Sequence, residues 1–167
     1  MNTVSAIETR YCGYRFRSRL EARWAVFFDQ FDSEWAYEVE GFRLPSGLYL
    51  PDFLLCSPAE SGGLFCEIKP LSALPTRCFE FGSGHASAPI DDQFPIEIKK
   101  MWELVSARPG FVGWITYGDP YDVITRGTLV FVNDHDVSAD GILLCRFDRE
   151  AKVARAARFE HGEHGAA

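Results

Sequence analysis

The sequence carries two carboxylates in short strand-like segments, Leu50-Pro51-Asp52-Phe53 and Phe65-Cys66-Glu67-Ile68-Lys69. Because residues i and i+2 of a strand lie on the same face, Glu67 and Lys69 are expected to point together. If the two segments pair as neighbouring strands, Asp52 joins them. Carboxylates gathered on an apolar sheet repel one another and are costly to desolvate, so their gathering indicates a functional site. A divalent cation between Asp52 and Glu67 would use both groups, with Lys69 facing a phosphate or a water molecule.

The order of these residues resembles the signature of the PD-(D/E)XK nuclease superfamily. Pro51-Asp52 and Glu67-Ile68-Lys69 match that signature in sequence order. Upstream, the segment from Phe16 to Ala25 looks like the first helix of the superfamily fold, whose glutamate often completes the metal site, and Glu21 matches that position. The tripeptide Glu67-Ile68-Lys69 alone is a weak signal, and the ordered set is a stronger one.

The resemblance covers about residues 11 to 118 of the chain. It includes Tyr117-Gly118-Asp119-Pro120, which looks like the strand end seen in phage and mobile-element members. It departs from many members at Pro70, where they carry glycine.

What the resemblance implies is a mixed α/β fold with a restriction-endonuclease-like core and a Mg²⁺-dependent DNA endonuclease activity. Asp52, Glu67, Lys69 and Glu21 would be the catalytic residues. The metal ligands would be Asp52, Glu67, the backbone carbonyl of Ile68, and Glu21. Hard oxygen ligands of this kind favour Mg²⁺ or Mn²⁺ over zinc. Lys69 would orient the attacking water or stabilise the charge on the phosphorus centre.

Each of these residues also has a plain structural interpretation. Ser18 and Glu21 form an S-x-x-E pattern, in which the glutamate caps the helix start instead of binding metal. Glu67 and Lys69 could be a surface ion pair, which contributes only ~0–1 kcal/mol, and Asp52 could be a charge beside a turn. The alternative function is therefore a catalytically inactive module of the same fold that binds a protein or DNA partner.

Hydrophobic periodicity predicts the elements of a single domain that spans residues 1–167. The expected order is a helix from Ser18, a three-stranded meander, a second helix from Pro95 to about Ala107, and a buried strand from Phe111 to Tyr117. The meander strands are expected at residues 34–40, 48–56 and 64–69, with Pro51 causing an edge, a bulge or a kink. This order gives a central mixed sheet flanked by helices.

Two further segments complete the expected organisation. A C-terminal β-rich extension is expected over about residues 121–159, with strands at 128–133 and 142–148, and the last residues, 160–167, form a tail. The segment from Ala151 to Phe159 is compatible with either a helix or a strand. The long polar loop from Pro70 to Phe94 is interpreted as a flap over the site.

The composition of the chain indicates the kind of cellular compartment in which the protein works. Apolar residues make up 47% of the chain and aromatic residues 14%, which supports a packed core. No apolar run approaches the ~18–20 residues that span a bilayer, and the first residues lack the apolar core of a signal peptide. We therefore expect a cytoplasmic protein with no membrane partner. Five scattered cysteines, at positions 12, 56, 66, 78 and 145, favour reduced, mostly buried thiols over a disulfide or a zinc site.

The net charge of −7 argues against a nucleic-acid enzyme, since such domains are usually basic. The distribution weakens that objection, because arginines crowd the first segment beside the expected site. The residues expected to contact DNA are Arg15, Arg17, Arg19, Arg23, Lys99 and Lys100. A second Glu-Ile-Lys, at Glu97-Ile98-Lys99, falls on a helix, where residues two apart do not share a face, and Glu97 is interpreted as compensating the helix dipole. Double-strand cleavage would require two sites, hence a homodimer or a partner protein.

Overall fold

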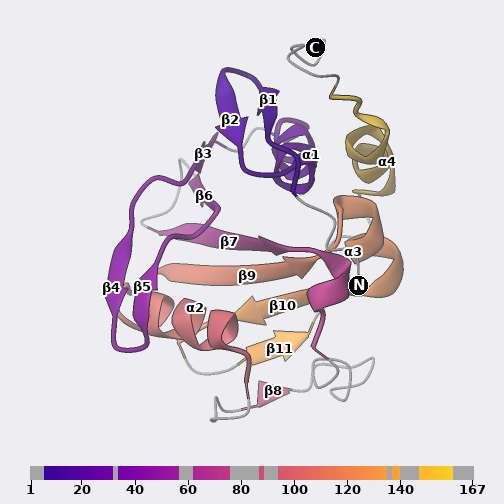
Figure 1. Ribbon diagram of the computed structural model, residues 1–167. Coiled ribbons are helices and arrows are strands. Elements are labelled where there is room, and N and C mark those ends of the chain that lie inside the picture. The colour runs from indigo at the N-terminus through magenta and orange to yellow at the C-terminus, as the bar shows by residue number, and fades with distance from the viewer. Residues whose placement is uncertain are drawn as a thin grey trace.

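The computed structural model describes residues 6–31, 34–56, 62–75, 87–88, 94–134, 137–139 and 147–159, and within these ranges the fold is mixed α/β (Figure 1). The strands are β1 (Thr9–Tyr11), β2 (Tyr14–Phe16), β3 (Glu34–Tyr37), β4 (Phe42–Leu44), β5 (Gly47–Tyr49), β6 (Phe53–Cys56), β7 (Gly63–Lys69), β8 (Ser87–Ala88), β9 (Phe111–Tyr117), β10 (Leu129–Val132) and β11 (Val137–Ala139). The helices are α1 (Arg19–Phe28), α2 (Ile96–Ser106), α3 (Pro120–Arg126) and α4 (Asp148–Ala156), with a 3₁₀ turn, η1 (Leu71–Ala73).

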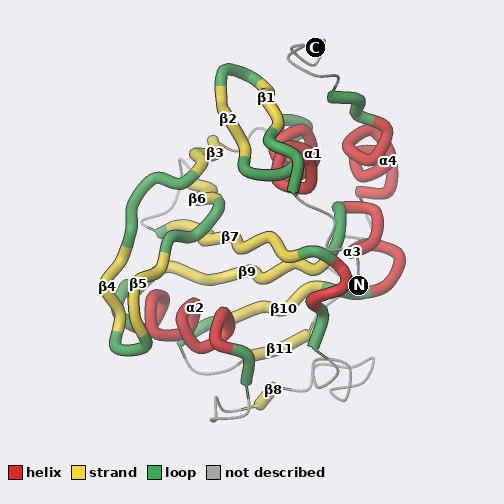
Figure 2. Tube along the Cα trace, viewed as in Figure 1, coloured by secondary structure: helices red, strands yellow, loops and turns green. Residues whose placement is uncertain are grey.

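The main sheet of the described residues has the strand order β3-β6-β7-β9-β10-β11-β8 (Figure 2). Its two central strands, β7 and β9, run parallel, and the other neighbours pair antiparallel. Parallel neighbours need a crossover connection, which α2 provides. The C-terminal ends of β7 and β9 consequently lie side by side, as Figure 1 shows, and Lys69 pairs with Tyr117 there.

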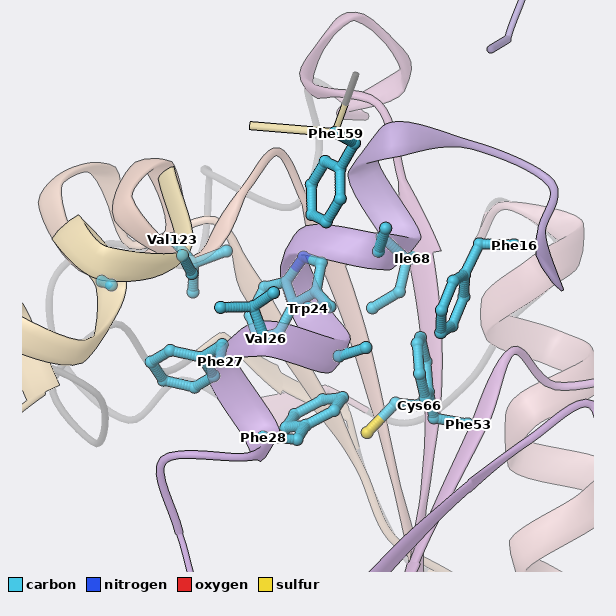
Figure 3. Close-up of a cluster of buried hydrophobic side chains, with 14 of the residues drawn as sticks. Phe16, Trp24, Val26, Phe27, Phe28, Phe53, Cys66, Ile68, Val123 and Phe159 are labelled. Atoms are coloured by element: carbon cyan, nitrogen blue, oxygen red, sulfur yellow. The ribbon is translucent and has the colours of Figure 1, made fainter. Parts of the chain in front are cut away.

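Two buried clusters cover the two faces of this sheet. The first joins α1 to α3 and α4 over β6 and β7, and Figure 3 shows Trp24, Phe27 and Phe28 of α1 gathered near Phe53 and Cys66. The second joins α2 to β7, β9 and β10. Cys66 and Ile68 belong to the first cluster and Phe65 to the second, which confirms the predicted alternation of β7.

The meander differs from the expected one at Pro51. The predicted strand 48–56 is two strands: β5 pairs with β4 in a separate hairpin, and β6 enters the main sheet between β3 and β7. Pro51 lies at the break, in line with its missing hydrogen-bond donor. β3 also ends earlier than expected, at Tyr37, because Glu38 adopts a left-handed backbone conformation with a φ of 46°.

The part that follows β9 is not the β-rich extension that was expected. The described residues there form β10 and β11 and also two helices, α3 and α4. A sequence signal for α3 was present, since Asp119 and Asp122 form a capping box, Pro120 starts the helix, and Gly127 ends it at a φ of 67°. The segment for which helix and strand were both open is helical from Asp148 to Ala156.

Several predictions fall wholly or partly outside the described residues. The flap over residues 70–94 is described only at 70–75, 87–88 and 94, and the strand 142–148 only at its last two residues, which lie at the start of α4. Cys78 and Cys145 also lie outside. Cys12, Cys56 and Cys66 are free thiols, and only Cys66 of these three is buried, whereas mostly buried thiols were expected. None of the helices in the described part of the chain has the length and apolarity of a membrane span.

Candidate functional site

The register of β6 and β7 brings the two predicted carboxylates together. Phe53 pairs with Cys66, so continuing the ladder by one residue places Asp52 opposite Glu67. Phe53 and Cys66 both belong to the cluster beneath α1, and their neighbours Asp52 and Glu67 therefore face the other side of the sheet. Both carboxylates are buried, with exposed fractions of 3% and 6%.

Asp52 uses both of its oxygens. Oδ2 accepts a hydrogen bond from the backbone N–H of Ile68 at 2.7 Å, and Oδ1 lies 2.7 Å from Nη2 of Arg17. Both contacts favour the ionised form, but burial and the charge of Glu67 outweigh them and raise the pKa of Asp52 to about 8. The contacts with Ile68 and Arg17 therefore do not fully compensate the cost of burying the ionised Asp52 beside Glu67.

Glu67 is held on one side only. Its Oε1 lies 2.5 Å from Nζ of Lys69, while its Oε2 is buried with no hydrogen-bond partner in the described part of the chain. The hydroxyl of Tyr49 is likewise buried without a partner there. Burial raises the pKa of Tyr49, and Glu67, which lies close to the Tyr49 hydroxyl, raises it further. Unpaired buried polar atoms of this kind are rare and call for an explanation.

Lys69 pairs with Glu67 and is also within electrostatic reach of Glu97, which the sequence did not place near the site. Burial lowers the pKa of Lys69, but the charges of Glu67, Asp52 and Glu97 raise it above its ordinary value. Glu97, from the first turn of α2, also accepts a hydrogen bond from the Tyr117 hydroxyl at 3.3 Å. Its interpretation as a dipole partner was therefore incomplete, because the crossover brings the start of α2 to the C-terminal end of β7.

The segment Tyr117-Gly118-Asp119-Pro120 ends β9 beside the site and starts α3. The N–H of Gly118 donates to the carbonyl of Lys69 at 2.9 Å, and its own carbonyl accepts from Nε1 of Trp24 at 3.0 Å. Gly118 has a φ of 101°, and an added Cβ would lie 2.7 Å from Cβ of Asp122, so glycine is required. This residue fixes the end of β7 relative to α1 and α3.

Glu21 has the contacts of a helix cap. Its Oε1 accepts from the Ser18 hydroxyl at 2.7 Å, and its Oε2 accepts from the Arg17 N–H at 3.1 Å and from the Tyr37 hydroxyl at 2.5 Å. The Ser18 side chain in turn accepts from the Glu21 N–H at 3.2 Å. Its charge nevertheless contributes to the raised pKa of Asp52, so it lies within electrostatic reach of the site. A metal role for Glu21 stays a prediction.

Replacing Glu21 with alanine is expected to lower the free energy of unfolding by about 2 kcal/mol, because the hydroxyls of Tyr37 and Ser18 lose their acceptor and the N–H of Arg17 keeps only the Tyr37 hydroxyl. We expect the affinity for Mn²⁺ to change by less than about threefold, since each Glu21 oxygen already has a partner. Urea denaturation and Mn²⁺ titration measure the two quantities. Ser18→Ala, which removes the cap without removing a carboxylate, is the control. A loss of Mn²⁺ affinity by more than about tenfold in the Glu21 variant alone would make Glu21 a ligand.

The predicted basic residues are distributed around the site unevenly. Arg17 is in the site. Arg15 pairs with Glu8 at the surface, and Nη1 of Arg23 lies 3.5 Å from Oδ2 of Asp119 at the start of α3. Lys100 donates to the carbonyl of Leu48 at 2.7 Å, which fastens the β4–β5 hairpin to α2. Lys99 lies on α2 beside it, and Arg19 lies in the first turn of α1 with a buried Nε. DNA contact by these six residues stays a prediction.

The donor set fits a hard divalent cation. It offers two buried carboxylates, one of which has an unpaired oxygen, and a raised pKa of Asp52 that a cation would reverse. No group of three or more His, Cys, Asp or Glu side chains is arranged to hold a metal within the described ranges. The resemblance implies the backbone carbonyl of Ile68 as a further protein ligand.

Comparison of the chain with protein-family models, with curated proteins and with solved structures finds no significant match.

Proposed function

We propose that this protein is a Mg²⁺- or Mn²⁺-dependent deoxyribonuclease with a restriction-endonuclease-like core of the PD-(D/E)XK type. The observation that carries the proposal is the juxtaposition of Asp52 and Glu67. The register of β6 and β7 sets these two buried carboxylates opposite each other on one sheet face, and Lys69 forms an ion pair with Glu67. Oε2 of Glu67 has no hydrogen-bond partner in the described part of the chain. The arrangement is unfavourable for stability alone and suits a bound cation.

Asp52, Glu67 and the Ile68 carbonyl would hold the cation. When bound, a divalent cation supplies Lewis-acid polarisation of a phosphate and a lowered pKa of bound water. The backbone N–H of Ile68 fixes the Asp52 carboxylate through Oδ2, so the aspartate is oriented by the strand itself. Orientation by a main-chain donor is the kind of support that metal ligands require.

Lys69 places a positive charge beside the carboxylates. Its pKa is raised, so it stays protonated at neutral pH. It therefore supplies a positive charge and does not act as a base. Its ammonium can stabilise negative charge that develops on the phosphate oxygens. Glu67 holds it through an ion pair at 2.5 Å, which limits its freedom before substrate arrives, and the charge of Glu97 adds to the raised pKa of Lys69.

Supercoiled plasmid and single-stranded DNA, each incubated with the purified protein and Mg²⁺ or Mn²⁺, are expected to be cut, and an excess of chelator is expected to prevent cutting. The same cations are expected to raise the melting temperature without DNA, because a ligand that binds only the folded state stabilises it. Ca²⁺, which oxygen ligands also bind, is the comparison cation in the measurement of the melting temperature. Absence of both cutting and a thermal shift with all three cations would contradict the proposal.

A second candidate function is a module of the same fold that binds a protein or DNA partner without cleavage. The net charge of −7 favours it, and so does the ion pair that Arg17 forms with Asp52. Under this alternative, Lys69→Ala would leave affinity for the partner intact, and Mn²⁺ would not raise the melting temperature.

A further inference from the structure

Arg17 holds the oxygen of Asp52 that a cation would need. Its Nη2 lies 2.7 Å from Oδ1 of Asp52, while Oδ2 is bound by the fixed backbone N–H of Ile68. The two partners of Asp52 differ in freedom. The Ile68 donor belongs to a central strand of the sheet, whereas the Arg17 side chain is 58% exposed. Arg17 is therefore the partner that can leave.

A second acid keeps Arg17 at the site when it leaves Asp52. Nε of Arg17 lies 2.6 Å from Oε1 of Glu38, and Nε and the backbone N–H also face the Tyr37 hydroxyl. Glu38 reaches this position through its left-handed backbone conformation, and its N–H donates to the Asp52 carbonyl at 2.9 Å. A non-glycine residue held in that conformation is more frequent at functional sites than elsewhere. The guanidinium is thus tethered by Nε, with Nη2 directed at the Asp52 carboxylate.

A guanidinium in this position can exchange a carboxylate for a phosphate. Its planar fork suits both anions, and its charge is retained at any working pH. A cation bound at Asp52 would repel the guanidinium, and a phosphate at the cation would attract it.

We propose that Arg17 is a positioning residue that occupies Oδ1 of Asp52 in the metal-free protein and moves to the substrate phosphate once a divalent cation has taken its place. This inference rests on the proposed nuclease function. It makes one side chain both a competitor of the metal and a binder of the DNA, so its removal has opposite effects on the two affinities.

The test compares Arg17→Ala and Arg17→Lys with the unaltered protein in two measurements. Mn²⁺ binding without DNA is followed by the loss of the free Mn²⁺ electron paramagnetic resonance signal. Arg17→Ala is expected to bind Mn²⁺ about three to ten times more tightly, since a half-exposed ion pair no longer competes. In plasmid cleavage at saturating Mn²⁺, the same variant is expected to raise KM by about tenfold or more, with a smaller change in kcat. Arg17→Lys keeps the positive charge but lacks the planar guanidinium. Its Mn²⁺ affinity and its KM are each expected to lie between those of Arg17→Ala and the unaltered protein.

Arg10→Ala is the control for metal affinity, since Arg10 is an exposed residue of β1, in the hairpin that precedes Arg17, and its replacement removes the same charge. Equal tightening of Mn²⁺ binding in Arg10→Ala would show a general charge effect and overturn the inference. Unchanged or weaker Mn²⁺ binding in Arg17→Ala, in a protein that binds Mn²⁺ and cuts DNA, would also overturn it while leaving the nuclease proposal standing. Failure of the unaltered protein and both Arg17 variants to bind Mn²⁺ would overturn the two together. Binding by Arg17→Ala alone would support the inference in its strongest form.

Discussion

Replacing Lys69 with alanine is expected to lower the rate of DNA cleavage by at least ~100-fold, because the site loses the positive charge that stabilises the phosphate oxygens during the reaction. Lys69 is held 2.5 Å from Glu67, and its pKa is raised, so its positive charge is fixed at the carboxylate pair. The loss should appear in kcat, with DNA affinity within about threefold of the unaltered protein, since Lys69 acts on charge that develops during the reaction. Single-turnover cleavage of plasmid at saturating Mn²⁺ measures the rate, and anisotropy of a labelled oligonucleotide measures the affinity.

Alanine at position 69 also removes the partner of Glu67 Oε1, so stability must be separated from chemistry. Lys69→Gln serves this purpose, because its amide can still donate to Glu67 but carries no charge. Lys152→Ala is the matched control, since Lys152 forms an exposed pair with Asp148 on α4. Cleavage by Lys69→Gln within about threefold of the unaltered protein would contradict a role for the charge and move the weight to the binding module.

The arrangement of the site was predictable where it depends on strand alternation and not where it depends on tertiary packing. The shared face of Glu67 and Lys69 follows from a period of two residues, and the position of Asp52 follows from antiparallel pairing of two segments joined by a short connection. The shared contact of Arg17 with Glu38 and Asp52 could not be predicted, because it depends on the left-handed conformation of Glu38.

The surroundings of Glu97, on helix α2, also depend on tertiary packing and could not be predicted from the sequence. Its local sequence, at the first turn after Pro95, predicts a dipole partner and nothing about Lys69. Only the crossover of α2, from the far edge of the sheet back to β9, brings Glu97 to Lys69 and Tyr117. By contrast, α3 was missed although its signals are local, since Asp119, Pro120 and Gly127 mark its two ends.

Replacing Asp52 with asparagine is expected to abolish metal-dependent cleavage and yet to stabilise the metal-free protein at pH 8.5 by about 2 kcal/mol. An aspartate has a pKa of about 4 in an unfolded chain, and burial and Glu67 raise that of Asp52 to about 8 in the folded protein. Between these values the folded protein retains a proton that the unfolded chain has lost. The stabilising contribution is therefore complete below pH ~4 and lost as pH rises through about 8.

Asparagine removes this dependence because it does not titrate. Its amide oxygen can still accept the hydrogen bond of the Ile68 N–H, and the half-exposed Arg17 can turn to Glu38 and solvent. Urea denaturation between pH 5 and 9 with a chelator present measures the effect, which should be a flatter pH profile above pH 5 for Asp52→Asn than for the unaltered protein. Asp148→Asn, which removes an exposed carboxylate of α4, should leave the profile unchanged.

Mn²⁺ should reverse the order of stability in this pair of proteins. The cation compensates the two carboxylates of the unaltered protein and stabilises its folded state, whereas Asp52→Asn lacks one ligand and gains little. A variant that is the more stable protein with chelator and the less stable one with Mn²⁺ would tie the unfavourable charge of Asp52 to metal binding. Lower stability of Asp52→Asn at pH 8.5 with chelator would instead mean that Arg17 and Ile68 fully compensate the Asp52 carboxylate, and the argument for a cation from its burial would fail.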